Sequence, residues 1–404
     1  MPISDARPKV DLMDLDIFVA NGEDAVFDQL RVEDRVHWNE PSRNGPGFWA
    51  LTRYADVRAA ASDHQRLSSA NGTQIVDRKV EGTGLSSLHN LDDPEHAKLR
   101  KISVPHLRAV KIRQWQEVID HSVELLLDEV QEVGRFDMVD LVSARLPMLV
   151  LSQVMGVPAV DAPRMVDWTN KLNSSDPDDV VDEDSLAAAR EEVMGYFEQL
   201  TKLRRAEPTN DLISVLANGQ KDGQPLTWQE LAAYYIVLVA AGNETTRHLV
   251  SGGTLALHET PGSWERVLAD GSLLGPMVEE MFRYVSPVAC MRRTAREDLA
   301  IGGKDISQGD KVVLWFSSAN RDPEMFDAPH EFRIDRQPNE HLTFGWGIHF
   351  CLGAHLARAE VLSFFRQARD RKLRFEVTGS PHRVRHNIFR GWTSLPVSAT
   401  KAGR

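Results

Sequence analysis

Apolar side chains recur at helical spacing along most of the chain from about residue 95 onward, as in amphipathic helices. Strand-like segments are short, and the two clearest lie at residues 47–53 (GFWALTR) and 310–318 (DKVVLWFSS). Helical segments lie between and after these two, which favours a mainly helical protein with a small sheet to one side. Since no linker rich in Gly, Ser or Pro divides the sequence, we expect one domain over residues 1–404.

The longest helical pattern begins at Thr227. Thr227 and Glu230 have the spacing of a capping box. The proline-free pattern then continues for roughly 30 residues, or about 45 Å of helix. Its first half is apolar on nearly every side, which predicts a central buried helix. Its middle, residues 242–246 (GNETT), is polar, and buried polar groups are costly unless they have partners or a function.

A second unusual segment is residues 344–353 (FGWGIHFCLG). An amphipathic helix is predicted over residues 354–370, so Cys351 lies at or just before a helix N-terminus, where unpaired N–H groups stabilise a thiolate. Gly345, Gly347 and Gly353 permit backbone conformations and close approaches that side chains forbid. Such a loop could hold a thiolate against a large flat group, and thiolate sulfur is an iron ligand in haem proteins.

Other interpretations of Cys351 remain open from the residues alone. A single cysteine is often a small buried apolar residue. A zinc site needs about four ligands, and only His349 lies close to Cys351 in the sequence. A nucleophilic cysteine with a histidine partner is also possible, although the flanking glycines do not single out that role.

Composition limits the setting of the protein. The chain has two cysteines, too few for a disulfide framework, so a reducing compartment is expected. The net charge of −12 argues against a general nucleic-acid binder. The N-terminus is polar and acidic with no long apolar segment, which predicts neither a signal peptide nor a membrane anchor. We therefore expect a cytoplasmic protein. Residues 174–185 (SSDPDDVVDEDS) are very acidic and predict a solvated loop between helices.

The pattern Phe-Gly-x-Gly-x-His-x-Cys-x-Gly resembles the haem-thiolate loop of the cytochrome P-450 superfamily. Further motifs resemble that family in the expected order, over nearly the full chain: residues 92–101 (DDPEHAKLRK) at the haem edge, 240–246 (AAGNETT) at the oxygen-activating turn, 280–283 (EMFR) as the E-x-x-R pair, and 319–336 (ANRDPEMFDAPHEFRIDR) packed against that pair. Two departures are minor: Trp346 stands where glycine is frequent, and Glu244 where many members have Asp.

The resemblance implies the cytochrome P-450 fold. That fold is mainly α with a small β region, here expected at about residues 35–75, 295–320 and 375–400. It holds haem between a long central distal helix and a proximal cysteine loop. Cys351 would be the axial ligand of the iron of haem b. The other expected haem-binding residues are His96, Arg100, Arg293, His349, Phe344 and Gly353.

Residue types support some of these roles. His96 and Arg100 are four residues apart on one helical face, which suits a haem propionate, although a solvated face is the ordinary alternative. The resemblance makes Glu280 and Arg283 a buried pair that braces the cysteine loop. Arg336 is the expected third member, with Arg333 left open.

The resemblance also assigns the distal side. Thr245 is expected to bond the carbonyl of Ala241 and loosen the helix, with Gly242 leaving the gap unfilled for water and O2. Glu244 is expected to bring protons from solvent. The expected substrate pocket comprises Val237, Ala240, Ala241, Val288, Ala289, Met291, Ile388 and Phe389. Residues 68–88 and the helices flanking the acidic loop are expected to form the lid.

The resemblance is nearest to soluble bacterial members that act on terpene alcohols, sterol side chains and methyl-branched lipids. It implies a monomeric monooxygenase without a membrane anchor that uses O2 and acts on a lipophilic small molecule. Electrons would come from NAD(P)H indirectly, through a ferredoxin reductase and a ferredoxin. The expected ferredoxin surface is a basic stretch: Arg100, Lys101, Arg108, Lys111 and Arg113. A haem protein that binds or senses a ligand without turnover, and a peroxygenase, are the alternatives.

Overall fold

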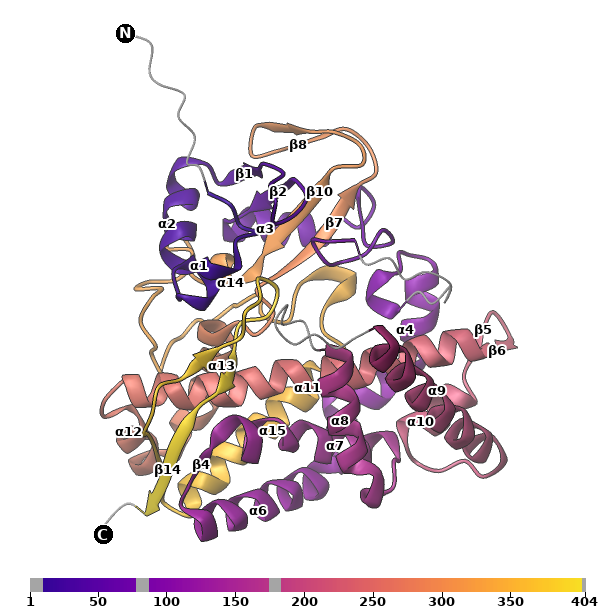
Figure 1. Ribbon diagram of the computed structural model, residues 1–404, viewed down its shortest axis with the longest axis vertical. Helices are drawn as coiled ribbons and strands as arrows, with labels where there is room; N and C mark the ends of the chain where they lie inside the picture. The colour runs from indigo at the N-terminus through magenta and orange to yellow at the C-terminus, as the bar shows by residue number, and fades with distance from the viewer. Residues whose placement is uncertain (1–9, 78–86, 174–182, 402–404) are drawn as a thin grey trace.

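The computed structural model describes residues 10–77, 87–173 and 183–401, and helices dominate this part of the chain (Figure 1). In chain order the helices are α1 (Leu15–Val19), α2 (Glu23–Glu33), α3 (Tyr54–Ser62), α4 (Glu95–Leu107), α5 (Ala109–Ile112), α6 (Gln116–Val133), α7 (Arg145–Met155), α8 (Ala162–Asn173), α9 (Glu183–Ala206), α10 (Leu212–Ala217), α11 (Trp228–Glu259), α12 (Ser263–Ala269), α13 (Leu274–Val285), α14 (Phe316–Ala319) and α15 (Ala354–Asp370). Short helical turns are η1 (Leu88–Asn90), η2 (Arg113–Trp115), η3 (Val139–Ser143), η4 (Ala159–Asp161), η5 (Gly271–Leu273) and η6 (Gly347–His349).

The strands are short and form small sheets. They are β1 (Val36–Asn39), β2 (Phe48–Leu51), β3 (Leu67–Ser68), β4 (Arg135–Asp137), β5 (Gln220–Lys221), β6 (Gln224–Pro225), β7 (Cys290–Ala295), β8 (Leu299–Ile301), β9 (Lys304–Ile306), β10 (Lys311–Trp315), β11 (Leu373–Val377), β12 (His382–Arg383), β13 (Trp392–Ser394) and β14 (Pro396–Lys401). The largest sheet has the order β1-β2-β10-β7-β3, and a three-stranded sheet has the order β11-β14-β4.

The two strands predicted most clearly from the sequence are neighbours in the largest sheet. Residues 47–53 contain β2 and residues 310–318 contain β10. They pair in parallel, with Val313 opposite Ala50. Figure 1 shows this sheet at one end of the molecule, beyond the helices that surround α11. The arrangement of helices with a sheet to one side is as the sequence predicts.

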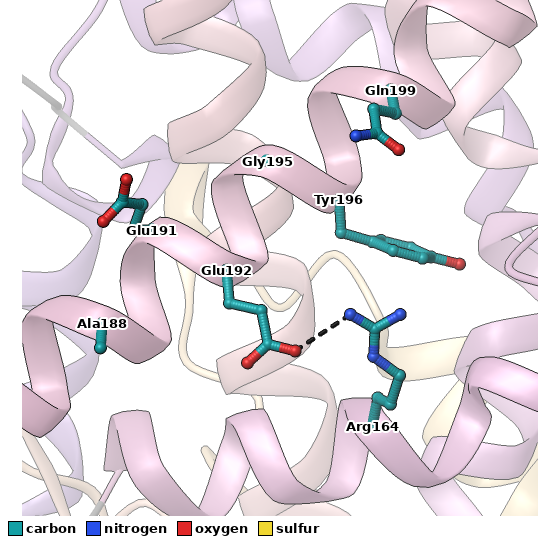
Figure 2. A pocket seen from close by; sticks show the side chains of 7 residues that line it. All are labelled: Arg164, Ala188, Glu191, Glu192, Gly195, Tyr196 and Gln199. Carbon is teal, nitrogen blue, oxygen red and sulfur yellow. Dashed lines mark hydrogen bonds and ion pairs between the residues drawn. The ribbon is translucent and has the colours of Figure 1, made fainter.

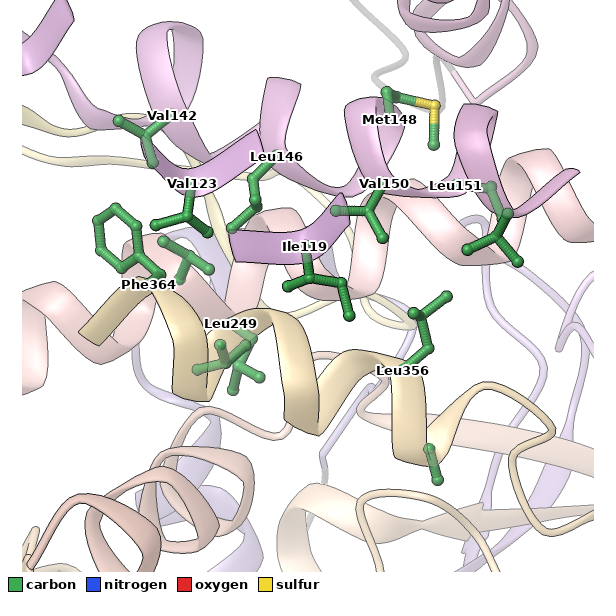
Figure 3. Close-up of a cluster of buried hydrophobic side chains, with 14 of the residues drawn as sticks. Ile119, Val123, Val142, Leu146, Met148, Val150, Leu151, Leu249, Leu356 and Phe364 are labelled. Atoms are coloured by element: carbon green, nitrogen blue, oxygen red, sulfur yellow. The ribbon is translucent and has the colours of Figure 1, made fainter. Parts of the chain in front are cut away.

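Helix α11 crosses the middle of the helical part (Figure 1). Its 32 residues begin at the expected capping box, in which Thr227 and Glu230 each bond the other's backbone. Side chains of α6, α7, α11 and α15 converge beside it, as Figure 3 shows for Ile119, Leu146, Leu249 and Phe364. Each of these four is at most 1% exposed. One packed core therefore holds α11, which carries the polar motif, and α15, which directly follows the cysteine loop.

Two sequence expectations meet the limits of the described chain. The predicted acidic loop spans residues 174–185. Its last three residues, 183–185, belong to the first turn of α9 instead. Residues 174–182 lie outside the described residues. Residues 78–86 of the predicted lid also lie outside them. Among the described helices, none is both long enough and apolar enough to span a bilayer.

Candidate active site

The cysteine loop is shaped by two glycines and closed by one backbone bond. Gly345 and Gly347 have φ of +69° and +73°, in the left-handed region that favours glycine. A Cβ on Gly347 would lie 2.6 Å from the carbonyl oxygen of Ala61, so the loop also passes too close to α3 for a side chain there. The N–H of Cys351 donates to the carbonyl of Phe344 at 2.8 Å. The predicted helix 354–370 is α15, and Cys351 lies three residues before its first residue.

The thiol of Cys351 is accessible, and its surroundings act on it in both directions. Desolvation by the surrounding protein raises the pKa of the thiol, whereas the N–H of Gly353 and the charges of Arg100 and Arg358 lower it. The helix N-terminus therefore favours the thiolate as expected, but in the protein chain alone desolvation has the larger effect on the pKa of the thiol. Metal coordination deprotonates a thiol outright.

Helix α13 braces the loop through a buried ion cluster. Glu280 accepts two bonds from Arg283, at 2.7 and 2.8 Å, and two from Nε of Arg336, both at 3.0 Å. Arg333 contributes only its backbone N–H, at 2.9 Å, and its side chain pairs with Asp327. The structure therefore places Arg336, the expected residue, in the cluster. The same helix holds the start of the loop, because the hydroxyl of Thr343 donates to the carbonyl of Phe282 at 2.7 Å.

We expect Glu280→Gln to destabilise the protein by about 3 kcal/mol, because it leaves two buried guanidinium groups without their anion. Arg283 and Arg336 are 0% and 5% exposed. Urea unfolding of the haem-loaded protein gives the loss. Glu324→Gln is the control: Glu324 pairs with Arg53 but is 66% exposed, so it should cost less than about 1 kcal/mol. Equal losses in the two variants would show that the cluster has no special role.

Nitrogen donors from three separate segments gather beside the loop. The rings of His96 and His349 lie 4.4 Å apart. Arg100 reaches over to donate to the carbonyl of Phe350. Arg293, on β7, is 6% exposed, and its charge acts on His349. These are the four predicted propionate partners, and the structure brings them together.

A fifth donor, His89, was missed in the sequence. It lies in η1, seven residues before His96. Burial and the charge of Arg293 lower its pKa to about 4. Burial and Arg293 likewise lower the pKa of His349 to about 3, and burial lowers the pKa of Arg293 to about 10. Only its position just before the DDPEH motif could have indicated His89.

These residues fit an iron porphyrin. The thiol would supply a ligand to the iron, and the cluster of cationic and imidazole groups suits two carboxylates. His96 Nε2 is buried and has no hydrogen-bond partner among the described residues, as a group awaiting an acceptor would be. A Cβ on Gly353 would meet nothing within 4 Å, so space is open beside the sulfur. The ring centroids of Phe344 and Phe282 lie 4.6 Å apart, and this contact packs the start of the loop against α13.

On α11, Thr245 makes the expected bond to the helix backbone. Its hydroxyl donates to the carbonyl of Ala241 at 3.0 Å. Val237, Ala241 and Thr245 follow one another at intervals of four, and all three keep accessible surface on this largely buried helix. The opening expected beside Gly242 stays a prediction. Helix α11 is continuous there, and a Cβ on Gly242 would lie 2.8 Å from Cδ2 of Leu151, so α7 leaves no room for a side chain at this position.

Glu244 lies inside the fold rather than at its surface. It is 9% exposed, with His248 Nε2 at 3.1 Å and Arg247 Nη1 at 3.4 Å. Burial raises the pKa of Glu244, but His248, Arg247 and His386 together hold it below its ordinary value. A second buried carboxyl, Glu360 on α15, was missed in the sequence. Burial raises the pKa of Glu360 well above its ordinary value, opposed by a hydrogen bond with Thr246.

The predicted pocket residues divide into two groups. Val237, Ala240, Ala241, Val288, Met291 and Phe389 keep accessible surface, and Val288 and Phe389 meet in a β-bridge. Ala289 and Ile388 are 1% and 7% exposed and pack with the N-terminal segment instead. For Ala289 and Ile388 the pocket role stays a prediction.

A separate hollow of about 580 Å³ opens between α8 and α9 (Figure 2). Arg164 and Glu192 form an ion pair across it at 3.0 Å, beside Tyr196. Its lining is rich in charged and amide groups, and none of the lining residues lies on α11, α13 or the cysteine loop. This hollow is therefore distinct from the site around Cys351.

Comparisons with known proteins agree with this geometry. Residues 47–392 match the family described as Cytochrome P450. Linalool 8-monooxygenase of Pseudomonas putida is 33% identical, over 96% of this chain and 98% of that protein. A methyl-branched lipid omega-hydroxylase of Mycobacterium tuberculosis is 36% identical, over 98% of this chain and 95% of that protein. The structure of a cytochrome P450 of Mycobacterium marinum in complex with pseudoionone superposes with a TM-score of 0.90, at 31% identity over 98% of this chain and 100% of that one.

Proposed function

This chain belongs to the cytochrome P450 family, and from that premise we propose that it inserts one oxygen atom of O2 into a C–H bond of a terpenoid, steroid or methyl-branched lipid. Membership makes it a haem-iron monooxygenase of the bacterial type and sets aside a haem protein without turnover. For each C–H bond hydroxylated, one oxygen atom enters the product. The other leaves as water, with two electrons and two protons supplied.

One observation carries the proposal for the site: an accessible cysteine next to five convergent nitrogen donors. Cys351 would bind the iron, and His89, His96, Arg100, Arg293 and His349 would face the propionates. Haem, when bound, supplies the binding and activation of O2. The Glu280 cluster would hold the cysteine loop in place and so keep the sulfur of Cys351 in a fixed position.

The polar residues of α11 would deliver the protons that the reaction consumes. The hydroxyl of Thr245 donates to the carbonyl of Ala241, which leaves its oxygen lone pairs to accept a bond from water. Thr245 Oγ would pass a proton toward the reacting oxygen, and Glu244 would replace that proton. The acid Glu244 next to the alcohol Thr245 in the sequence favours a reaction that starts from O2. A peroxygenase takes its oxygen from peroxide and needs no proton delivered to O2.

The accessible pocket residues support a lipophilic substrate. Val237, Ala240, Ala241, Val288, Met291 and Phe389 carry no charge, so hydrophobic contact would provide most of the affinity. The relatives named for linalool, for methyl-branched lipids and for a complex with pseudoionone support the same class. From the sequence we also propose that the protein is a monomer and that it acts in the cytoplasm.

A binding screen tests the substrate class. Haem-loaded protein is titrated with linalool, testosterone and a methyl-branched fatty acid, and the haem absorption is recorded. At least one of these should displace water from the iron and shift the absorption, at micromolar concentration. Short-chain amino acids and sugars of similar size are the controls. A response to the polar controls alone would overturn the proposed class.

We further propose that electrons arrive from a ferredoxin, itself reduced by NAD(P)H through a ferredoxin reductase, on the surface formed by α4, α5 and the cysteine loop. Helix α5 packs against both α4 and α15. Lys101, Arg108 and Arg113 are exposed there, and so is Phe350, the residue before the cysteine. Basic groups next to the haem-binding loop suit an acidic partner.

Charge reversal should weaken this docking. We expect Arg108→Glu and Arg113→Glu each to slow reduction by ferredoxin roughly tenfold at low salt, because steering raises association rates by at least that factor. Stopped-flow absorption of the haem measures the rate. The difference should shrink as salt screens the charges. Lys202→Glu on α9, where Lys202 is 71% exposed, is the matched control and should leave the rate unchanged. A rate independent of salt would reject this docking surface.

A further inference from the structure

The carboxylate of Glu244 is held by a segment that comes from the far end of the sequence. Residues 384–391 join β12 to β13 and lie beside the middle of α11. Gly391 presses directly on His248, the neighbour of Glu244: a Cβ at Gly391 would lie 2.0 Å from Nδ1 of that ring. The ring of His248 is 1% exposed, and its Nε2 faces Glu244 Oε2 at 3.1 Å. Packing therefore fixes His248 against the acid.

His386 connects the same segment to the pocket wall. Its Nδ1 accepts the backbone N–H groups of Ile388, at 2.8 Å, and of Phe389, at 3.2 Å. Its ring also lies 5.2 Å from the ring of Phe389. Since Nδ1 is an acceptor here, the proton of the neutral ring lies on Nε2. The ring of Phe389 lies in turn 6.3 Å from the ring of His248, the neighbour of Glu244.

We propose that His248 and His386 are positioning residues that hold Glu244 against the segment carrying Phe389, so that a substrate touching Phe389 also sets the position of the proton donor. This inference rests on the proposed function of Glu244. Its basis is packing: His386 holds the backbone of Phe389, and Phe389 and Gly391 lie against His248, which faces Glu244. The substrate and the acid are thereby linked through one histidine ring.

The charged groups around Glu244 come from three elements. Arg247 and His248 lie on α11, and His386 on the 384–391 segment. Asp140, in η3, interacts with Arg247 from the side of the protein surface. Arg247 is thus shared between two carboxylates, and the two histidines are the groups that tie Glu244 to the pocket wall.

An infrared titration of the substrate-free, haem-loaded protein tests the arrangement without turnover. The carbonyl band of protonated Glu244 is identified by its loss in Glu244→Gln. In His248→Asn this band should appear at a pH about one unit higher than in the wild type, because burial then acts without the imidazole that faces the carboxylate. His258→Asn, on the same helix, is the control. The band of Glu360 should not move in either variant. An unmoved Glu244 band in His248→Asn would overturn the proposal.

The link to the substrate is tested by two replacements of one residue. The amide oxygen of His386→Asn can still accept the N–H of Ile388, whereas His386→Leu cannot accept it. With the substrate that the binding screen identifies, His386→Asn should keep both its affinity and its coupled product. His386→Leu should lose both. Full coupling in His386→Leu would remove the link. If no substrate class responds, the proposed function fails, and the infrared titration still decides the positioning of Glu244.

Discussion

Replacement of Cys351 by serine is expected to abolish the thiolate-type carbon monoxide spectrum of the reduced protein and to remove product formation. Serine oxygen is a far poorer donor of electron density to iron than a thiolate, which favours cleavage of the O–O bond. The loop itself should survive, because the N–H of residue 351 still donates to the carbonyl of Phe344 and because the hydroxyl is smaller than the thiol. Haem content should therefore fall less than activity does.

Cys290→Ser is the matched control, since Cys290 is the only other cysteine of the chain. Cys290 is 0% exposed, and its Sγ lies 3.8 Å from the carbonyl oxygen of Asn387. Burial raises the pKa of this thiol far above its ordinary value, so it stays protonated and is no ligand. The control should keep the thiolate-type spectrum at a modest loss of stability. Loss of that spectrum in the control alone would reassign the ligand.

Thr245→Ala is expected to separate electron consumption from product formation. Haem binding, substrate binding and reduction should remain, because none of them uses the hydroxyl. The rate of product formation should fall by about 100-fold, the lower end of what a positioned proton-transfer group contributes. Hydrogen peroxide should accumulate instead, because both oxygen atoms then leave together with two electrons and two protons when no proton is positioned for cleavage of the O–O bond. Product and peroxide are assayed together against the reduced nicotinamide consumed.

The chain offers a close control for this variant. Thr254 lies on the same helix, and its hydroxyl donates to the carbonyl of Val250 at 2.8 Å, as Thr245 does to that of Ala241. Thr254→Ala removes the same kind of bond away from the site and should leave coupling intact. Glu244→Gln should act one step earlier, with slower turnover and a larger solvent isotope effect. Full coupling in Thr245→Ala would remove this residue from the mechanism, and undiminished product from added peroxide would favour a peroxygenase.

Local patterns determined the elements that carry the site. The capping box at Thr227 and the absence of proline were enough to place α11, because helix starts depend on residues three apart. The amphipathic pattern gave α15 its two ends, and the glycines at 345 and 347 indicated a loop that only glycine could follow. The strands β2 and β10 were likewise visible as short apolar segments.

Side-chain contacts between distant segments could not be read in this way. The sequence left Arg333 and Arg336 as alternatives, and only the path of the loop shows that Arg336 turns its guanidinium to Glu280. Ala289 and Val288 are equally apolar, yet Ala289 is 1% exposed and Val288 keeps accessible surface. Only the structure shows that Leu151 leaves no room for a side chain at Gly242.

The sequence by itself determined the family, the mainly helical fold and the cysteine loop, because these depend on residue types at short, fixed spacings. The tertiary structure decided which groups meet: His89 beside Arg293, Glu360 with Thr246, and His248 between Glu244 and Phe389. The physical reason is that burial and charge act through space. Glu244 has His248 and Arg247 one turn along its own helix, but its burial and the position of His248 depend on residues 384–391, which only the folded chain brings against that helix.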